Sequence, residues 1–156
     1  MTATADPARV PVNSLVFGYG PMLPLVAAAV GAWTMAPPWP AVATRLAIVW
    51  AGAILIFVAG VRRGYGFDRS AASTGAEIAT MLVYFVPGAA ALVFGMVGRP
   101  LIALALLAAG FVLVAVLDPL AARAGNAPLH FARLRGPQMT LAIVSLAALL
   151  VRAVQR

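Results

Sequence analysis

Few side chains in this sequence are of the types that carry acid–base or metal chemistry. The chain has 156 residues, of which four are acidic, one is histidine and none is cysteine. A membrane enzyme built from them would use Glu77, Asp118 and His130, and these groups would have to converge within hydrogen-bond reach of one point. We predict a polar cluster at one face of the membrane, made of Glu77, Asp118, Arg62, Arg123 and His130.

Each of these residues also has a purely structural interpretation, which we favour. Glu77 begins an apolar run, where a carboxylate complements the positive end of a helix. Asp118, followed by Pro119, ends another run and is expected to pair with Arg123 or Arg62. A single histidine does not suffice for a bis-histidine haem, and thiolate sites need cysteine. We therefore predict no catalytic, cofactor-binding or metal-binding residues and no cofactor.

The composition is that of a membrane protein. Hydrophobic residues make up 63% of the chain and charged residues 10%, and the mean hydropathy is +1.00. Soluble domains carry about 25% charged residues. All 11 basic residues are arginines, and they flank apolar runs instead of forming one polar face. This distribution favours membrane orientation over nucleic-acid binding, so we expect no nucleic-acid partner.

Five apolar runs are each close to the roughly 20 residues that cross about 30 Å of hydrocarbon. Because backbone groups in hydrocarbon must pair within the structure and no run alternates strictly, helices are favoured over a barrel. Gly98, Arg99 and Pro100 predict a tight turn and an antiparallel hairpin. The sequence predicts an all-α polytopic membrane bundle. It has a polar N-terminal tail (1–15) and a five-span transmembrane domain (16–156) with spans at about 16–36, 41–61, 77–97, 101–117 and 137–154.

The arginines also predict an orientation, because loops on the cytoplasmic side are enriched in basic residues. With five spans, one side carries seven arginines (Arg9, Arg62, Arg63, Arg69, Arg123, Arg133 and Arg135). The other side carries four (Arg45, Arg99, Arg152 and Arg156). We predict the N-terminus inside and the C-terminus outside.

Apolar and basic residues alternate loosely in the segment before the last predicted span. Leu129, Phe131 and Leu134 are expected to face the acyl region of the bilayer. Arg133 and Arg135 are expected to face phosphates, as in an interfacial helix. We therefore predict that Arg133 and Arg135 contact lipid headgroups.

Small residues recur four apart in the spans, a spacing that lets helix backbones approach closely in lipid. The pairs are Ala27 with Gly31, Ala28 with Ala32, Ala91 with Gly95, and Ala105 with Ala109. Packing inside this bundle is favoured over docking to another protein.

Three stretches carry a resemblance to a known family: residues 20–24, 50–64 and 128–135. The second contains Ile-Leu-x-Phe and Gly-x-x-x-Gly after an aromatic and a small residue. The chain thereby resembles the family catalogued as domain of unknown function 3429, which includes the mitochondrial transmembrane protein 69. Ile56 and Arg63 depart from its pattern, which has serine and tryptophan there. The resemblance implies a five-span inner-membrane protein with no established activity.

Three functions are compatible with these patterns. The leading one is a non-enzymatic accessory or assembly component of an inner-membrane complex, with membrane lipids and other membrane protein subunits as partners. The second is a small transporter or lipid-handling protein, in which Pro24 and Pro87 kink their spans and Thr80, Tyr84 and Ser145 line a polar cavity. The third is an enzyme acting at the membrane interface.

Overall fold

The structure, a computed structural model, is all-α in its described residues, 12–64, 75–125 and 131–155. Its elements are α1 (Val12–Tyr19), the 3₁₀ turn η1 (Gly20–Met22), α2 (Leu23–Thr34), α3 (Trp39–Gly64), α4 (Gly75–Met96), α5 (Pro100–Arg123) and α6 (Phe131–Val154). Five of the resulting segments are long and apolar enough to cross a membrane, with α1, η1 and α2 together forming the first. The predicted all-α five-span bundle is confirmed.

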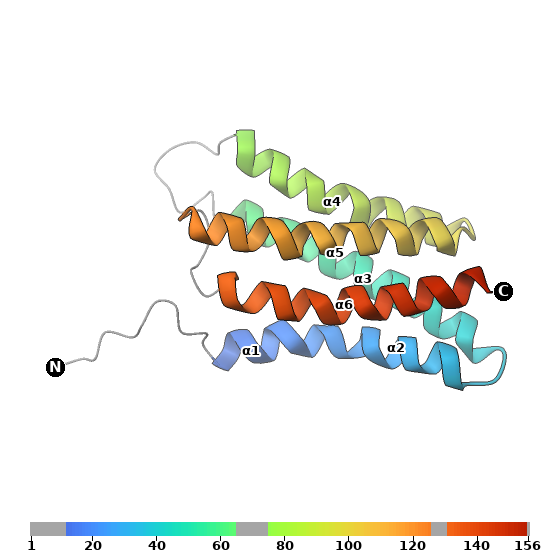
Figure 1. Ribbon diagram of the computed structural model, residues 1–156. Coiled ribbons are helices and arrows are strands. Elements are labelled where there is room, and N and C mark those ends of the chain that lie inside the picture. The colour runs from blue at the N-terminus through green and yellow to red at the C-terminus, as the bar shows by residue number, and fades with distance from the viewer. Residues whose placement is uncertain (1–11, 65–74, 126–130, 156) are drawn as a thin grey trace.

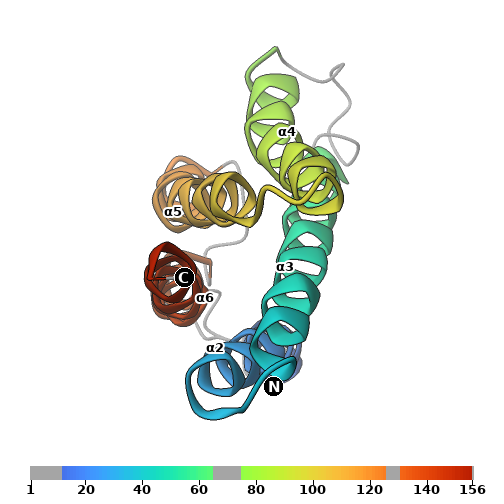
Figure 2. The same ribbon diagram turned by 90° about the vertical axis from the view of Figure 1, so that its right-hand side faces the viewer.

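Successive spans run in opposite directions, and the first and last spans lie side by side and run in the same direction (Figure 1). Viewed end-on, α3 crosses the bundle obliquely, with α4 packed against one part of it and α2 against another (Figure 2). One end of the bundle holds the starts of α1, α4 and α6 and the ends of α3 and α5 (Figure 1). We call it the N-side, and the opposite end the C-side.

The helix bounds differ from the predicted spans where a proline was taken as a boundary. The fourth span was predicted to end at Leu117, before Asp118 and Pro119, but α5 continues to Arg123. The fifth was predicted to begin at Pro137, but α6 begins at Phe131. Proline disturbs the helix only around its own missing hydrogen bond, so a packed helix can continue through it.

The first span is longer at its N-terminal end than predicted. Helix α1 begins at Val12, inside the polar tail predicted over 1–15, and residues 1–11 lie outside the described part. The 3₁₀ turn η1 separates α1 from α2, whose second residue is Pro24. In contrast, α4 runs without interruption through Pro87. Pro24 therefore coincides with a break in the α-helix, and Pro87 does not.

The turn between α4 and α5 is as the sequence predicts. Gly98 has a positive φ of 73°, a conformation that costs glycine little because it lacks a Cβ. The amide of Arg99 donates to the Phe94 carbonyl (2.8 Å), and α5 begins directly afterwards at Pro100. The Gly98 amide donates to the Gly95 carbonyl as well (3.3 Å). The two bonds satisfy carbonyls at the end of α4, and the chain reverses its direction within three residues.

Glycines allow α3 and α4 to touch along their backbones. A Cβ on Gly88 would lie 3.1 Å from the Leu55 Cβ and 3.2 Å from the Gly52 carbonyl oxygen. One on Gly95 would lie 2.9 Å from the Ile48 side chain. The Ala91–Gly95 pair is therefore packed inside the bundle, as predicted.

The other predicted small-residue pairs differ in their surroundings. Ala32 is buried and Ala28 is partly buried against the core. Ala105 and Ala109 are both exposed on α5, so the prediction of internal packing was wrong for that pair.

At the C-side, polar side chains tie the first and last spans together. The Trp33 indole N–H donates to the Ala148 carbonyl of α6 (3.1 Å), and the Arg152 Nε donates to the Ala32 carbonyl of α2 (3.2 Å). The Arg152 guanidinium also lies over the Trp33 ring, 5.8 Å from its centre. A cation at the last carbonyls of α2 is favourable because that end of a helix is negative.

Replacing Gly88 by alanine is expected to loosen the α3–α4 contact. The added methyl would press on the Leu55 Cβ and the Gly52 carbonyl, which would have to move by a few tenths of an ångström. Because both belong to the packed α3 helix, we expect a loss of about 1–3 kcal/mol in the free energy of unfolding. Gly60→Ala is the matched control, because nothing lies within 4 Å of the Cβ position there. Unfolding in mixed detergent micelles, followed by circular dichroism, measures both. Equal effects of the two substitutions would contradict the close contact.

The predicted orientation can be measured by cysteine labelling, because the chain has no cysteine of its own. Arg99 lies in the C-side turn and Ala124 follows α5 at the N-side, and both are exposed. With the N-terminus inside, Arg99→Cys should react with a membrane-impermeant maleimide on intact cells. Ala124→Cys should react only after permeabilisation. The reverse pattern would overturn the predicted orientation.

Candidate functional site

The centre of the candidate site is Asp118, a fully buried carboxylate in α5 near the N-side of the bundle. Tyr84 of α4 donates its hydroxyl to Oδ1 of Asp118 at 2.9 Å. The Arg135 Nε of α6 lies 3.1 Å from Oδ2, and the Arg62 Nε of α3 lies 3.8 Å from Oδ1. One carboxylate thus contacts three other helices.

A second layer of contacts connects this carboxylate to the first span. The Arg135 Nη1 donates to the side-chain oxygen of Gln138 (3.2 Å), and the Gln138 amide donates to the Gly18 carbonyl of α1 (2.8 Å). The Arg135 guanidinium also lies 4.4 Å from the centre of the Phe131 ring. We call Arg62, Tyr84, Asp118, Arg135 and Gln138 the polar cluster. Together with the Gly18 carbonyl it joins all five spans.

Because the charged members of this cluster are buried, each of them needs a charged or hydrogen-bonding partner. An isolated charge in a medium of low polarity costs many kcal/mol, and the cost is offset only where opposite charges and hydrogen bonds surround it. Asp118 receives two guanidinium groups and one phenol, all of them buried. Each partner comes from a different helix, so the helices must stay in register for the carboxylate to remain paired.

The structure brings together only part of the cluster predicted from the sequence. Asp118 and Arg62 form an ion pair, one of the two pairings expected for Asp118. Arg123 is exposed at the end of α5 and is not its partner. Glu77 lies seven residues before Tyr84 on α4, about 10 Å along the helix axis, so it lies away from Asp118. His130 lies outside the described residues.

The segment before the last span is more buried than the sequence predicts, while the headgroup contacts of Arg133 and Arg135 stay predictions. Arg135 is buried, and its Nε faces Asp118. Phe131 and Leu134 are buried in the protein instead of facing acyl chains. The reason is that this segment belongs to α6 and packs with it, whereas the prediction treated it as an interfacial helix. Arg133 is exposed, and Leu129 lies outside the described residues.

Two members of the cluster, Tyr84 and Gln138, and the role of Arg135 were missed by sequence reasoning. Helical spacing carried a signal for the burial of Asp118, Arg135 and Gln138. Asp118 continues a buried stripe on α5 that contains Leu107, Phe111 and Val114, four and three residues apart in turn. A charged side chain on an apolar helical face is expected to be buried and paired. The same spacing leads from Arg135 through Gln138 and Ala142 along α6, all of them buried.

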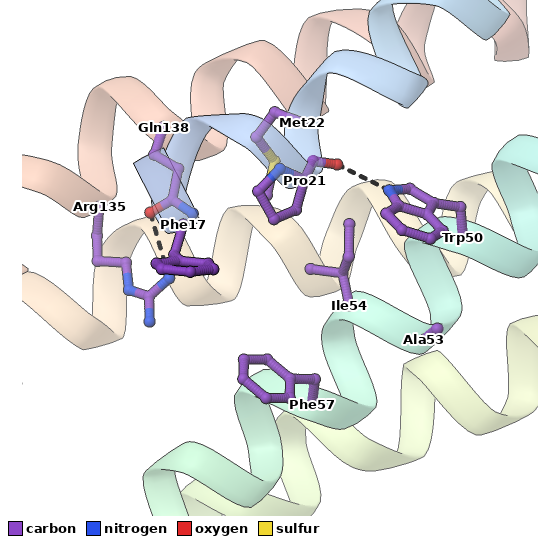
Figure 3. Close-up of a pocket in the computed structure, with 9 residues that line it drawn as sticks. All are labelled: Phe17, Pro21, Met22, Trp50, Ala53, Ile54, Phe57, Arg135 and Gln138. Atoms are coloured by element: carbon purple, nitrogen blue, oxygen red, sulfur yellow. Dashed lines mark hydrogen bonds between the residues drawn. The ribbon is translucent and has the colours of Figure 1, made fainter. Parts of the chain in front are cut away.

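A groove of about 260 Å³ lies beside the polar cluster. Arg135 and Gln138 form one end of it, Trp50 lies at the other, and the walls are apolar (Figure 3). It is lined by Phe17, Pro21, Met22, Trp50, Ala53, Ile54, Phe57, Arg135 and Gln138. The Trp50 indole N–H donates to the Pro21 carbonyl at 2.7 Å, so its polar group is engaged in the protein.

Fold and site together define a polytopic integral membrane protein whose buried charges are paired across its spans. In the part of the chain that the structure describes, no three His, Cys, Asp or Glu side chains are placed to hold a metal ion. Comparisons with protein-family models, with curated proteins and with solved structures found no match to this chain.

Breaking the polar cluster is expected to destabilise the bundle in a graded way. Asp118→Ala leaves buried guanidinium groups beside an empty site and should cost about 3–5 kcal/mol of unfolding free energy. Tyr84→Phe removes one hydrogen bond and should cost about 1–2 kcal/mol. The double variant Asp118→Asn with Arg135→Gln should cost less than the sum of its single variants, because both partners of the Asp118–Arg135 ion pair are removed together.

Detergent unfolding followed by circular dichroism measures this series. Ser145→Ala is the matched control, because Ser145 is also buried on α6 but bonds only the Leu141 carbonyl of its own helix (2.7 Å). It should cost less than about 1 kcal/mol. A loss for Asp118→Ala no larger than that of the control would contradict the role of the cluster.

Proposed function

We propose that this protein is a non-enzymatic accessory or assembly component of a larger membrane complex, which it contacts through α4. The observation that carries this proposal is the exposure of that helix. Only 17% of its membrane-spanning window is buried in the protein, against 33–39% for the other four spans. A helix so little covered by its own bundle offers the widest face to another membrane protein.

The chemistry of the exposed α4 face supports this role. Ala79, Val83 and Val86 are exposed and follow one another at helical spacing of four and three residues. The larger side chains of Ile78, Leu82 and Phe85 are exposed beside them, so the face is apolar throughout. Van der Waals packing of such a face supports association with another helix in lipid. The partner we propose is therefore a transmembrane helix with a complementary apolar face.

The polar residues support a structural role more than an enzymatic one. Asp118, Arg135 and Tyr84 contact one another in the interior. The interfacial enzyme considered from the sequence needed Glu77 and Asp118 at one point, but they lie about two helical turns apart along the bundle. Groups that stabilise each other in this way would have to leave their partners before acting on a substrate.

The transporter hypothesis receives less support. Tyr84, which was expected to line a polar cavity, is buried and donates to Asp118. Ser145 is buried and donates to its own helix. Neither residue, nor Thr80, lines the groove beside the cluster.

We further propose that the complex lies in a bacterial cytoplasmic membrane and that the chain is related to the family of domain of unknown function 3429. The arginine asymmetry, with the N-terminus inside, supports the first of these. The resemblance of residues 20–24, 50–64 and 128–135 supports the second.

Purification of the native protein tests the accessory role. In a mild detergent it should elute as a complex of constant composition, larger than the 16.0 kDa chain in its micelle. Val86→Trp places a bulky side chain on the α4 face and should reduce the recovered partner at least about tenfold, a change of about 1.4 kcal/mol in binding. Val116→Trp is the matched control, because Val116 is similarly exposed on α5.

The control variant should retain the partner at the level of the unmodified protein. Recovery of the unmodified chain only as a monomer, or equal loss of the partner in both variants, would overturn the proposal. The folded state of each variant is checked by its circular dichroism spectrum before purification.

A further inference from the structure

The groove beside the polar cluster has one polar end and apolar walls (Figure 3). It thereby matches an amphiphile, which has a polar head and an apolar chain. Its polar end is formed by the side chains of Arg135 and Gln138 from α6. Phe17 and Phe57 stand at its sides and are 78% and 71% exposed, so the groove is open toward the surrounding hydrocarbon. A molecule can therefore enter it sideways from the bilayer.

Arg135 has hydrogen-bonding capacity that its protein neighbours do not use. A guanidinium carries five N–H donors. In Arg135, Nε faces Asp118 and Nη1 donates to Gln138, and the described residues supply no acceptor for the remaining N–H groups. The side chain is nevertheless only 8% exposed, and it lines the groove. A buried cation with unused donors favours an anionic ligand that accepts several hydrogen bonds.

The charge of Arg135 also favours an anion. Its guanidinium is a cation, and it shares the Asp118 carboxylate with Arg62. An anion on the groove side of Arg135 would give this guanidinium a second negative partner. Trp50, at the far end, has its indole N–H engaged by the Pro21 carbonyl, so that end presents an apolar ring surface. The head of an amphiphile belongs at Arg135 and its chain belongs toward Trp50.

Position and size narrow the choice of ligand. Arg135 is the fifth residue of α6, about 6 Å from the N-side start of that helix, within reach of the headgroup region. The groove volume of about 260 Å³ lies below the range of about 300–1,000 Å³ that encloses a whole drug-sized ligand. It suits a headgroup phosphate and the first part of one acyl chain, with the rest of the lipid remaining in the bilayer.

We propose that this groove holds an anionic phospholipid of the surrounding bilayer, with its phosphate on Arg135 and one acyl chain against Ile54 and Phe57. The bound lipid completes the hydrogen bonding of Arg135 and covers the opening between α1 and α3. This inference is independent of the α4 contact, because it concerns a different face and different residues.

Quenching of tryptophan fluorescence by brominated lipids tests the proposal, because Trp50 lines the groove. The full chain carries three tryptophans, so Trp33→Phe and Trp39→Phe make Trp50 the only one. The variant whose only tryptophan is Trp50 is reconstituted into phosphatidylcholine vesicles. These vesicles contain either brominated phosphatidylglycerol or brominated phosphatidylcholine at equal mole fraction. We expect the anionic lipid to associate about fivefold more strongly, the ratio typical of one basic residue at an anionic headgroup.

Two variants connect this preference to the groove. Ala53→Phe fills it from an exposed position on α3 and should abolish the preference for the anionic lipid. Val49→Phe, one turn earlier on the same helix, is exposed and does not line the groove, so it should keep the preference. The double variant Asp118→Asn with Arg135→Gln removes the headgroup contact together with the carboxylate that faces it, and should also abolish the preference.

Three results would overturn the proposal. Equal quenching by the two brominated lipids would show that the groove does not select an anion. A preference retained in Ala53→Phe would place the headgroup contact elsewhere, for example at the exposed Arg133. A preference retained in the double variant that folds normally would exclude Arg135 as the contact.

Discussion

A single buried carboxylate constrains the whole bundle. Asp118 cannot stay charged in an apolar interior unless opposite charges and donors surround it, and those come from three other helices. Through Gln138 the same set of contacts reaches the backbone of the first span. Apolar side chains pack with little directional preference, whereas ion pairs and hydrogen bonds tolerate only small displacements. The cluster therefore specifies which helix faces meet and in what register.

Contacts outside the cluster also hold the helices together. Between the two ends, glycines let α3 and α4 come into backbone contact, so close packing replaces the hydrophobic driving force that is missing in lipid. At the C-side, Trp33 and Arg152 join the first and last spans by side-chain bonds to backbone carbonyls. The bundle is thus held by directional bonds near both ends and by close packing between them.

The position of the polar side chains bears on the proposed function. The cluster members contact each other inside the bundle. The binding that we propose uses two other surfaces. The exposed face of α4 is apolar and is proposed to meet another membrane helix. The groove beside Arg135 is apolar along its walls and cationic at one end, and it is proposed to hold a lipid.

The sequence by itself determined the class and the number of crossings, because hydropathy and length alone decide whether a helix can span hydrocarbon. The turn at Gly98 followed equally directly, since a positive φ favours glycine. The helix boundaries predicted next to Pro119 and at Pro137 were wrong, because a packed helix continues through an isolated proline. Most partners of Asp118 were decided only by the tertiary structure. The sequence offered Arg123 or Arg62, and Arg62 is the partner. Arg135 and Tyr84 come from α6 and α4, and their approach to Asp118 depends on how the whole bundle packs.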